Sequence, residues 1–228
     1  MYNTTIKGYK PVRYLHETLG DPCPVVGDVP VLQFINTVKN RNGINRKDYV
    51  KCYQDFLNLC HDAGLISLDD YHVLDFEAHC YVAEAKQRFN TMINMREVLY
   101  DIVYCLFNGK DIHEASLECL NGLIGEANAC RRLVITANGI EKAWINAEEE
   151  IARPLWLMAL KADELLQSNG LKNIRRCYCG NFYIDSTKNG KRRWCNPQTC
   201  GNAARKRTYR ERKKRTEDVR ILDVQMCG

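Results

Sequence analysis

The pattern of apolar and polar positions predicts a mainly helical protein. Apolar residues recur three or four positions apart in several stretches, and these begin or end at typical capping residues such as Ser67, Gly64 and Gly109. The predicted helices cover residues 48–63, 68–107 with a break near Cys80, 112–129, and 147–168 with Pro154 kinking the helix or starting its main part. Their apolar faces predict a shared core.

Two stretches depart from this helical pattern. Residues 131–137 and 140–145 are joined by Asn138-Gly139, which predicts a β-hairpin. The apolar run at residues 31–38 fits either a strand or a helical turn, because periodicity cannot separate the two over so short a length. The fold class predicted from these patterns is mainly α with a small β-hairpin (α+β).

Four of the twelve cysteines form two close pairs near the C-terminal end, and the others are scattered singly. The paired residues are Cys177, Cys179, Cys195 and Cys200, spaced as C-x-C, fifteen residues and C-x4-C. In a reducing compartment the scattered thiols behave as small apolar side chains, although a redox-sensing pair among them stays open.

The two pairs predict a structural zinc site. About forty residues with few large apolar side chains cannot fold on their own apolar core, and zinc is commonly held by four thiolates from two short-range pairs. In an extended strand Cys177 and Cys179 would share one face, and Gly180 supplies a tight turn that brings both sulfurs to one ion. We expect the loss of one ligand to unfold the module without disturbing the helical part.

The segment between the pairs predicts a small hairpin. Residues 181–184 fit a strand with Phe182 and Ile184 inward, and residues 191–194 fit its return strand after a turn at Asn189-Gly190. Trp194 is placed to cover the metal. A helix is then expected to start near Pro197 and to run to about residue 216.

Charge is concentrated in this module. Residues 171–216 hold 15 Lys and Arg and 2 Asp and Glu, a net +13, whereas the remaining 18 basic and 26 acidic residues give −8. A zinc ion with four thiolates subtracts two charges and leaves the module strongly positive. This asymmetry is typical of nucleic-acid-binding proteins.

The predicted basic helix carries cations on every face, whereas a solvated surface helix usually alternates both signs. Asn202, Arg205 and Lys206 lie nearest its start and are the candidates for reading bases. Residues from Arg210 onward, including Lys213 and Lys214, are the candidates for phosphate contacts. The other candidates for nucleic-acid contacts are Lys191, Arg192, Arg193 and Arg207.

The run from Arg175 to Arg207 resembles the CGNR-type zinc finger. The matching residues are Phe182, Asp185, Arg192, Arg193, Trp194, Cys195, Cys200, Gly201 and Asn202. Ala203 replaces the arginine of the signature, and the first cysteine pair is tighter than the usual separation. The resemblance implies a metal-stabilised, nucleic-acid-binding module.

The preceding half resembles the ABATE-type domain that accompanies this finger in bacterial stress-induced transcription regulators. The stretches FINTV, MREVLYDIV and ARPLWLMALKADELL carry the resemblance. It implies a regulatory or effector-binding role, and the candidate pocket residues in the matching stretches are Asn36, Thr37, Arg41, Arg96 and Trp156. The alternative is structural: Asn36 and Thr37 cap a local structure, and Arg96 pairs with a carboxylate.

The sequence gives little support for an enzyme, a secreted protein or a membrane protein. There is no metalloprotease, Walker, dinucleotide-binding or nucleophile-elbow motif, and a zinc ion with four thiolates has no open position for catalysis, so no enzyme is expected. The first residues lack the apolar core of a signal peptide and no apolar run is long enough to cross a membrane, which predicts a cytoplasmic protein.

The sequence therefore predicts a DNA-binding transcription regulator with three parts. These are a helical regulatory domain over residues 1–170, a zinc finger with its basic helix over residues 171–216, and a tail over residues 217–228. Duplex DNA is the expected partner, with a small-molecule effector and a homodimer as further expectations. The alternatives are RNA binding, with Tyr178, Tyr183 and Tyr209 stacking on bases, and a protein-interaction module for an acidic partner.

Overall fold

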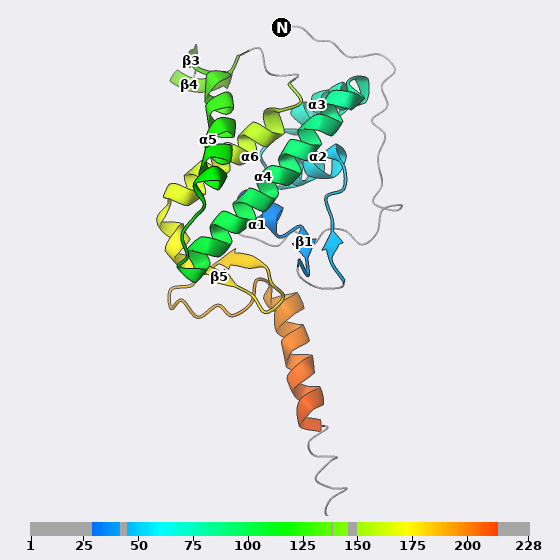
Figure 1. The fold of residues 1–228 in the computed structure, drawn as a ribbon, viewed down its shortest axis with the longest axis vertical. Helices are drawn as coiled ribbons and strands as arrows, with labels where there is room; N and C mark the ends of the chain where they lie inside the picture. The colour runs from blue at the N-terminus through cyan, green and yellow to red at the C-terminus, as the bar shows by residue number, and fades with distance from the viewer. Residues whose placement is uncertain (1–28, 42–44, 138, 146–149, 214–228) are drawn as a thin grey trace, which may run out of the picture.

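Helix α4 is the centre of the fold. The computed structural model describes residues 29–41, 45–137, 139–145 and 150–213. In it α4 crosses the bundle and contacts each of the other helices of the helical domain, α1, α2, α3, α5 and α6 (Figure 1). The helices are α1 (Pro30–Ile35), α2 (Tyr53–Asp62), α3 (Leu68–Cys80), α4 (Val82–Asn108), α5 (Glu114–Ala129) and α6 (Arg153–Gln167). The strands form antiparallel pairs, so the predicted mainly helical class with small β elements is confirmed.

The core is built from the apolar stripe of α4 and the faces that neighbouring helices turn toward it. Met92, Met95 and Leu99 of α4 are almost fully buried, as are Phe34 of α1 and Phe56 of α2, whose rings lie 4.8 Å apart. Burial of such side chains contributes about 1.5–3 kcal/mol each, and the buried stripe of α4 extends from Ala85 to Val103.

Capping residues set several of the helix boundaries that the sequence predicts, although α2 begins at Tyr53 and not at residue 48, because Asp48 belongs to a strand that pairs with Val38. Ser67 and Asp70 form a capping box in which each side chain accepts from the other residue's backbone N–H, so α3 begins there. The predicted break near Cys80 falls at Tyr81, whose backbone (φ −116°, ψ 58°) is not helical. Gly109 adopts φ +62° and ends α4, a left-handed conformation that favours glycine.

The ambiguous apolar run at residues 31–38 is helical at its start. Pro30 stands in the first turn of α1, and four of the helix's six residues are buried. The chain then enters a short antiparallel pair that the sequence did not predict, β1 (Val38–Lys39) with β2 (Lys47–Asp48). The segment is therefore a helix and not a strand at its start, because its apolar side chains are buried on several sides of the backbone.

The second hairpin forms as predicted, with β3 (Arg131–Thr136) paired to β4 (Gly139–Trp144). Its base is anchored where Trp144 stacks on Trp156, with ring centroids 5.9 Å apart. Helix α6 begins at Arg153 with Pro154 in its first turn, so the proline starts the helix rather than kinking it.

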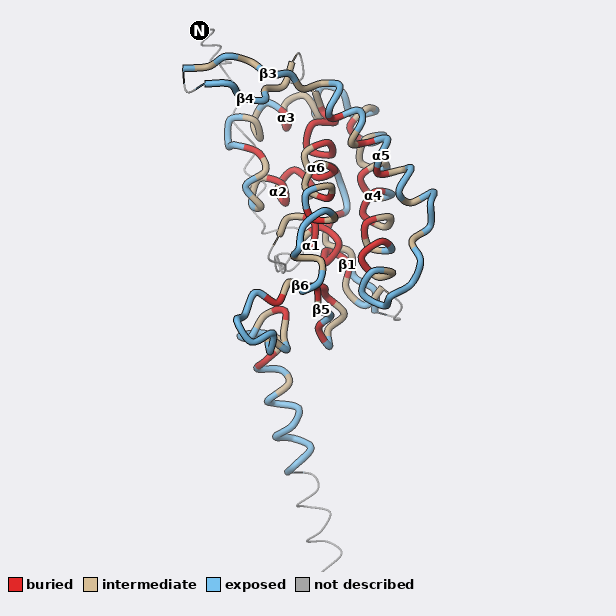
Figure 2. Tube along the Cα trace, turned by 90° about the vertical axis from the view of Figure 1, so that its left-hand side faces the viewer, coloured by how far each residue is buried: buried red, intermediate tan, exposed pale blue. Residues whose placement is uncertain are grey.

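The C-terminal module continues directly from α6 through a 3-10 turn, η1 (Asn169–Asn173). Strand β5 (Ile174–Arg176) pairs with β6 (Phe182–Ile184), and η2 (Pro197–Gly201) leads into a helix over residues 202–213. Figure 2 shows this module below the helical bundle, with the exposed helix extending away from it. None of the helices in the described parts of the chain is long and apolar enough to cross a membrane.

Strand β6 separates two apolar clusters. Phe182 is fully buried in the main helical core together with Ile174, whereas Tyr183 on the opposite face is buried against Cys177 and Cys195. Successive side chains of a strand point to opposite faces, so one strand contributes to both clusters. The finger and the helical bundle therefore share a core, and the expectation that the finger can unfold without disturbing the helical part does not fit this packing.

Two details of the predicted finger are wrong. Residues 191–194 do not form a return strand, because β6 pairs with β5 instead and Asp185 binds the backbone N–H of Arg192, which draws this segment into a loop. Tyr183 is not an exposed base-stacking residue, because it is 2% exposed. Tyr178 and Tyr209 are exposed.

Candidate metal centre and nucleic-acid interface

The first cysteine pair lies in a tight turn rather than in the extended strand expected for it. The N–H of Gly180 donates to the carbonyl of Cys177 at 2.9 Å, and the N–H of Cys177 donates to the carbonyl of Asn181 at 2.8 Å. Gly180 has φ +91°, where a side chain would be strained. This turn directs both thiols to the same side, as the glycine predicts.

The second pair is positioned by the start of the basic helix. The side chain of Asn196 accepts from the N–H groups of Gln198 and Thr199, an N-cap that orients the turn carrying Cys200. A Cβ atom on Gly201 would lie 3.3 Å from the Trp194 ring, so glycine permits this close approach. Trp194 packs against the cysteine cluster, as predicted.

Four sulfur atoms meet in this cluster. The Sγ atoms of Cys177, Cys179, Cys195 and Cys200 all lie within 4.8 Å of one another, with Cys179 and Cys195 3.5 Å apart and Cys195 and Cys200 3.6 Å apart. Tetrahedral zinc with Zn–S bonds of about 2.3 Å requires sulfurs roughly 3.8 Å apart. The donor set and spacing fit a closed structural zinc site.

The clustered thiols affect one another's ionisation. A hydrogen bond from the Cys195 thiol lowers the pKa of Cys179 to about 5, whereas the same contact together with burial raises the pKa of Cys195. Burial also raises the pKa of Cys200. Further thiolates beside the first are therefore unfavourable without a metal, and metal binding should release protons and weaken at low pH.

Asn181 connects the cysteine cluster to the helical domain. Its Nδ2 lies 4.0 Å from the Cys195 Sγ, and its Oδ1 accepts from the Lys39 ammonium at 2.8 Å. Asn181 is not among the site residues predicted from the sequence, although Cys179-Gly180-Asn181 repeats the CGN tripeptide at residues 200–202. That repeat is the local signal that could have pointed to it.

Asp185 organises the basic loop between the two pairs. One carboxylate oxygen accepts from the N–H and hydroxyl of Thr187, and the other accepts from the N–H of Arg192. The hydrogen bonds from Thr187 are the main reason that the pKa of Asp185 lies below its usual value. The resulting loop exposes Lys188, Lys191 and Arg193 on one side of the module.

Arg192 has partners inside the module. Its guanidinium donates to the backbone carbonyls of Ile184, Trp194 and Cys195 at 2.6–3.1 Å, and it lies 4.8 Å from the Tyr183 ring centroid. Arg192, predicted from the sequence as a nucleic-acid contact, therefore holds the loop closed over the cysteine cluster.

The helix over residues 202–213 is exposed along almost its whole length and projects away from the body (Figure 1). Its ionised side chains are one acid, Glu211, and six bases, namely Arg205, Lys206, Arg207, Arg210, Arg212 and Lys213. Asn202 accepts from Arg205 at 2.8 Å at the helix start. Lys214 lies outside the described residues.

Four of the five predicted effector residues lie together, but they are held by internal contacts. Arg96 is 0% exposed and donates to both carboxylate oxygens of Asp48, at 2.8 and 2.5 Å, and to the Thr37 hydroxyl at 3.0 Å. Arg41 pairs with Glu97 and lies over the Tyr100 ring at 3.9 Å. Burial lowers the pKa of Arg41, and its ion pair with Glu97 opposes that shift.

Trp156 belongs to a different cluster. It packs with Ala127 and Ala152 near the base of the β3–β4 hairpin, and its indole N–H donates to Glu126 at 3.1 Å. The structure does not bring it together with the other four residues.

Asn36 joins the helical domain to the finger. Its amide donates to the Phe182 carbonyl at 2.7 Å and accepts from the Phe182 N–H at 2.9 Å, so it substitutes for a neighbouring strand along β6. Both groups are buried, and the contact spans 146 positions in sequence. A buried polar contact of this kind stabilises the protein and also specifies which residue of β6 lies opposite Asn36.

We expect Asn36→Ala to lower the free energy of unfolding by about 1–3 kcal/mol, because it leaves the N–H and C=O of Phe182 buried without a partner. Chemical denaturation of the zinc-loaded protein measures this change. Asn45→Ala, at an exposed asparagine, is the matched control and should change stability by less than about 0.5 kcal/mol. Equal effects of the two variants would contradict a role for Asn36 as a clamp.

These features define a class of protein: a helical domain joined through a common core to a zinc-finger module with a protruding basic helix. Residues 28–169 match the ABATE family, described as "Putative stress-induced transcription regulator", and residues 173–213 match the CGNR zinc finger. The chain belongs to the ABATE family. Both resemblances identified from the sequence are confirmed, and neither family is one of enzymes. A comparison with curated proteins finds no match.

Proposed function

We propose that this protein is a cytoplasmic transcription regulator that binds duplex DNA through its finger module, as a monomer or as a homodimer on paired half-sites. The observation that carries the proposal is the exposed helix over residues 202–213, with six bases against one acid. An α-helix fits the major groove of B-DNA, and clustered Lys and Arg release the counterions condensed on its phosphates.

The proposed contacts divide by position. Asn202, Arg205 and Lys206 face bases from the helix start, while Arg207, Arg210 and Lys213 contact phosphates farther along it. The loop residues Lys188, Lys191 and Arg193 add a second phosphate-binding surface. Arg192 is assigned instead to the internal structure of the loop, because three backbone carbonyls already accept from it.

Fluorescence anisotropy of zinc-loaded protein with random duplex DNA and with single-stranded RNA, at two salt concentrations, tests this proposal. We expect tighter binding to the duplex, and we expect a chelator to abolish it. Preference for RNA would instead support RNA binding. No binding to either nucleic acid would overturn the proposal in favour of a protein partner.

Replacing the three proposed phosphate contacts of the helix, Arg207, Arg210 and Lys213, by alanine should weaken binding and reduce the slope of log affinity against log salt by about 0.9 for each phosphate that is no longer neutralised. The matched control replaces three exposed bases of the helical domain, Lys86, Arg132 and Lys142, by alanine. Anisotropy at several salt concentrations measures both slopes. The same decrease in both variants would mean that net charge, and not the helix, determines binding.

A further inference from the structure

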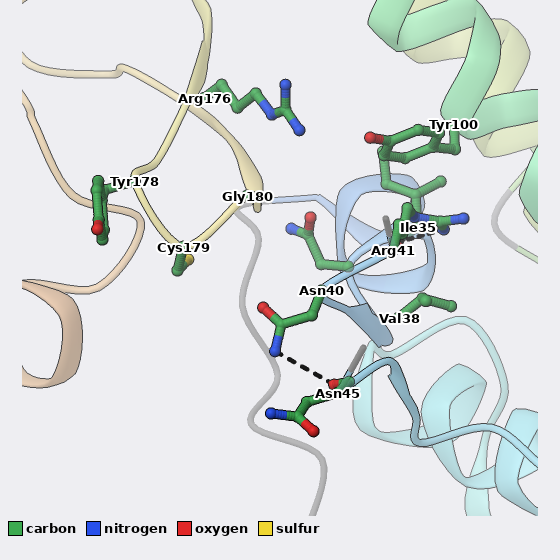
Figure 3. Close-up of a pocket in the computed structure, with 11 residues that line it drawn as sticks. Ile35, Val38, Asn40, Arg41, Asn45, Tyr100, Arg176, Tyr178, Cys179 and Gly180 are labelled. Carbon is green, nitrogen blue, oxygen red and sulfur yellow. Dashed lines mark hydrogen bonds between the residues drawn. The ribbon is translucent and has the colours of Figure 1, made fainter. Parts of the chain in front are cut away.

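A cavity of about 420 Å³ lies where the helical domain meets the finger (Figure 3). The helical domain contributes residues from the α1–β1 segment together with Asn45 and Tyr100, and the finger contributes Arg176, Tyr178, Cys179 and Gly180. Its volume is within the range of about 300–1,000 Å³ that is typical of small-molecule sites. Because its walls come from both parts of the chain, a bound molecule would contact both.

The charged side chains that line this cavity are cationic. Among the described residues, Arg41 and Arg176 line it and no carboxylate does. Arg41 is neutralised by Glu97, whereas Arg176 has no carboxylate partner among the described residues. The Arg176 guanidinium lies over the rings of Tyr104 and Phe182, at 5.5 and 5.7 Å, and in Figure 3 it extends toward the side where Tyr100 lies.

This arrangement favours an oxyanion. A guanidinium binds carboxylate or phosphate through two parallel hydrogen bonds, and the cation–π contacts of Arg176 with Tyr104 and Phe182 do not use up its N–H donors. The amides of Asn40 and Asn45 add polar groups to the rim, and the Tyr100 ring adds an apolar surface. The chemistry is that of a small molecule with a carboxylate or phosphate group.

The cavity is also connected to the basic helix. Tyr178 lines it, and the Arg207 guanidinium lies 4.2 Å from the centre of the Tyr178 ring. Tyr178 stands in the turn between two cysteines of the metal cluster, so a molecule that fixes this turn also fixes the residue on which Arg207 rests. Coupling of this kind requires a structural element that both sites influence.

From these contacts we infer that the cavity binds a small carboxylate or phosphate compound through Arg176, and that its occupancy reaches the DNA-binding helix through Tyr178 and Arg207. The second part rests on the proposed function, because it requires DNA binding by the helix. A bound oxyanion orders the turn around Tyr178, holds the helix in one orientation and tightens DNA binding.

The first experiment is a titration of ¹⁵N-labelled, zinc-loaded full-length protein with inorganic phosphate and with benzoate at constant ionic strength. We expect saturable amide shifts at Tyr178, Gly180 and Asn45 with at least one probe. A response to phosphate alone indicates a phosphorylated ligand, and a response to benzoate alone indicates an aromatic carboxylate. No saturable shift at these residues, or shifts confined to residues 202–213, would overturn the proposed site.

Arg176→Gln should weaken binding of the responding probe at least tenfold. The matched control is Arg175→Gln, the same change on the neighbouring residue of β5, whose guanidinium donates to the carbonyls of Lys172 and Ile174 and does not line the cavity. Its probe affinity should stay within about twofold of the wild type. Equal weakening in both variants would mean that the probe is held by general electrostatic attraction and not by a specific contact with Arg176.

The coupling is measured as DNA affinity with and without a saturating probe. We expect the probe to tighten binding by about fivefold or more, which competition for the basic helix cannot do because competition weakens it. Tyr178→Leu should remove this effect while the probe still saturates the cavity. An unchanged or weakened affinity with bound probe would overturn the coupling, whereas absence of DNA binding without any probe would overturn the proposed function alone.

Discussion

Replacing Cys195 with serine should abolish DNA binding and also lower the melting temperature of the helical domain. Loss of one of four thiolates removes most of the roughly 10 kcal/mol that zinc binding contributes to folding of such a module. The helix over residues 202–213 then loses its anchor at Cys200 and Gly201. We expect affinity for duplex DNA to fall at least tenfold, about 1.4 kcal/mol.

The effect on the helical domain follows from the shared core. Phe182 is 0% exposed among the side chains of the bundle, and removing a buried phenylalanine costs about 3–5 kcal/mol. Each kcal/mol shifts the melting temperature by about 2–4 °C in a chain of this size, so a decrease of about 10 °C is expected. A finger that folded independently would leave the melting temperature of the helices unchanged.

Circular dichroism melting at 222 nm and anisotropy with duplex DNA measure the two effects. Cys80→Ser, at an exposed cysteine outside the cluster, is the control and should change neither. Chelation of zinc from the wild type should reproduce both effects of Cys195→Ser. Unchanged melting together with abolished DNA binding would show that the finger and the bundle are energetically independent.

Replacing Arg96 with methionine should destabilise the protein by about 3–5 kcal/mol. Arg96 is fully buried and binds Asp48 through two hydrogen bonds and Thr37 through a third, so its removal leaves the half-buried carboxylate of Asp48 without its cation. The variant tests whether Arg96 is structural, the alternative that its sequence context left open.

Denaturation in urea measures this change. The control is Arg88→Met on the same helix, where a half-buried guanidinium lies 3.7 and 3.8 Å from Glu84 and Glu150 and should contribute about 0–1 kcal/mol. An Arg96→Met protein of unchanged stability would contradict the structural role and return Arg96 to the candidates for ligand binding.

Local signals in the sequence predict most of the elements. Ser67 with Asp70, Gly64 and Gly109 act through nearby backbone, so these helix ends follow from short-range chemistry, and the sequence Asn138-Gly139 predicts the pairing of β3 with β4. Residues 191–194 fail as a strand for a tertiary reason. Asp185 binds the N–H of Arg192, and β6 finds its partner in β5, which the turn pattern does not specify.

The candidate sites likewise contain some features that local sequence predicts and others that depend on tertiary contacts. The cysteine spacing and the basic run identify the metal centre and the helix, because both consist of residues close in sequence. Asn36 is predicted from its family stretch to belong to an effector pocket; it lines the cavity at the junction, but the sequence gives no sign that its amide also binds both backbone groups of Phe182. Arg176 and Tyr178 could not be found as cavity residues, because the opposite wall is formed by the α1–β1 segment and α4.

The sequence by itself determined the helical class, the four-cysteine zinc module and the charge of its helix, because periodicity, ligand spacing and charge are properties of neighbouring residues. Only the tertiary structure decided that Phe182 and Ile174 enter the helical core, that Asn36 binds β6, and that a cationic cavity forms at the junction. These contacts join residues far apart in the sequence, 146 positions in the case of Asn36 and Phe182. Their formation depends on how apolar faces pack in space, which no local pattern specifies.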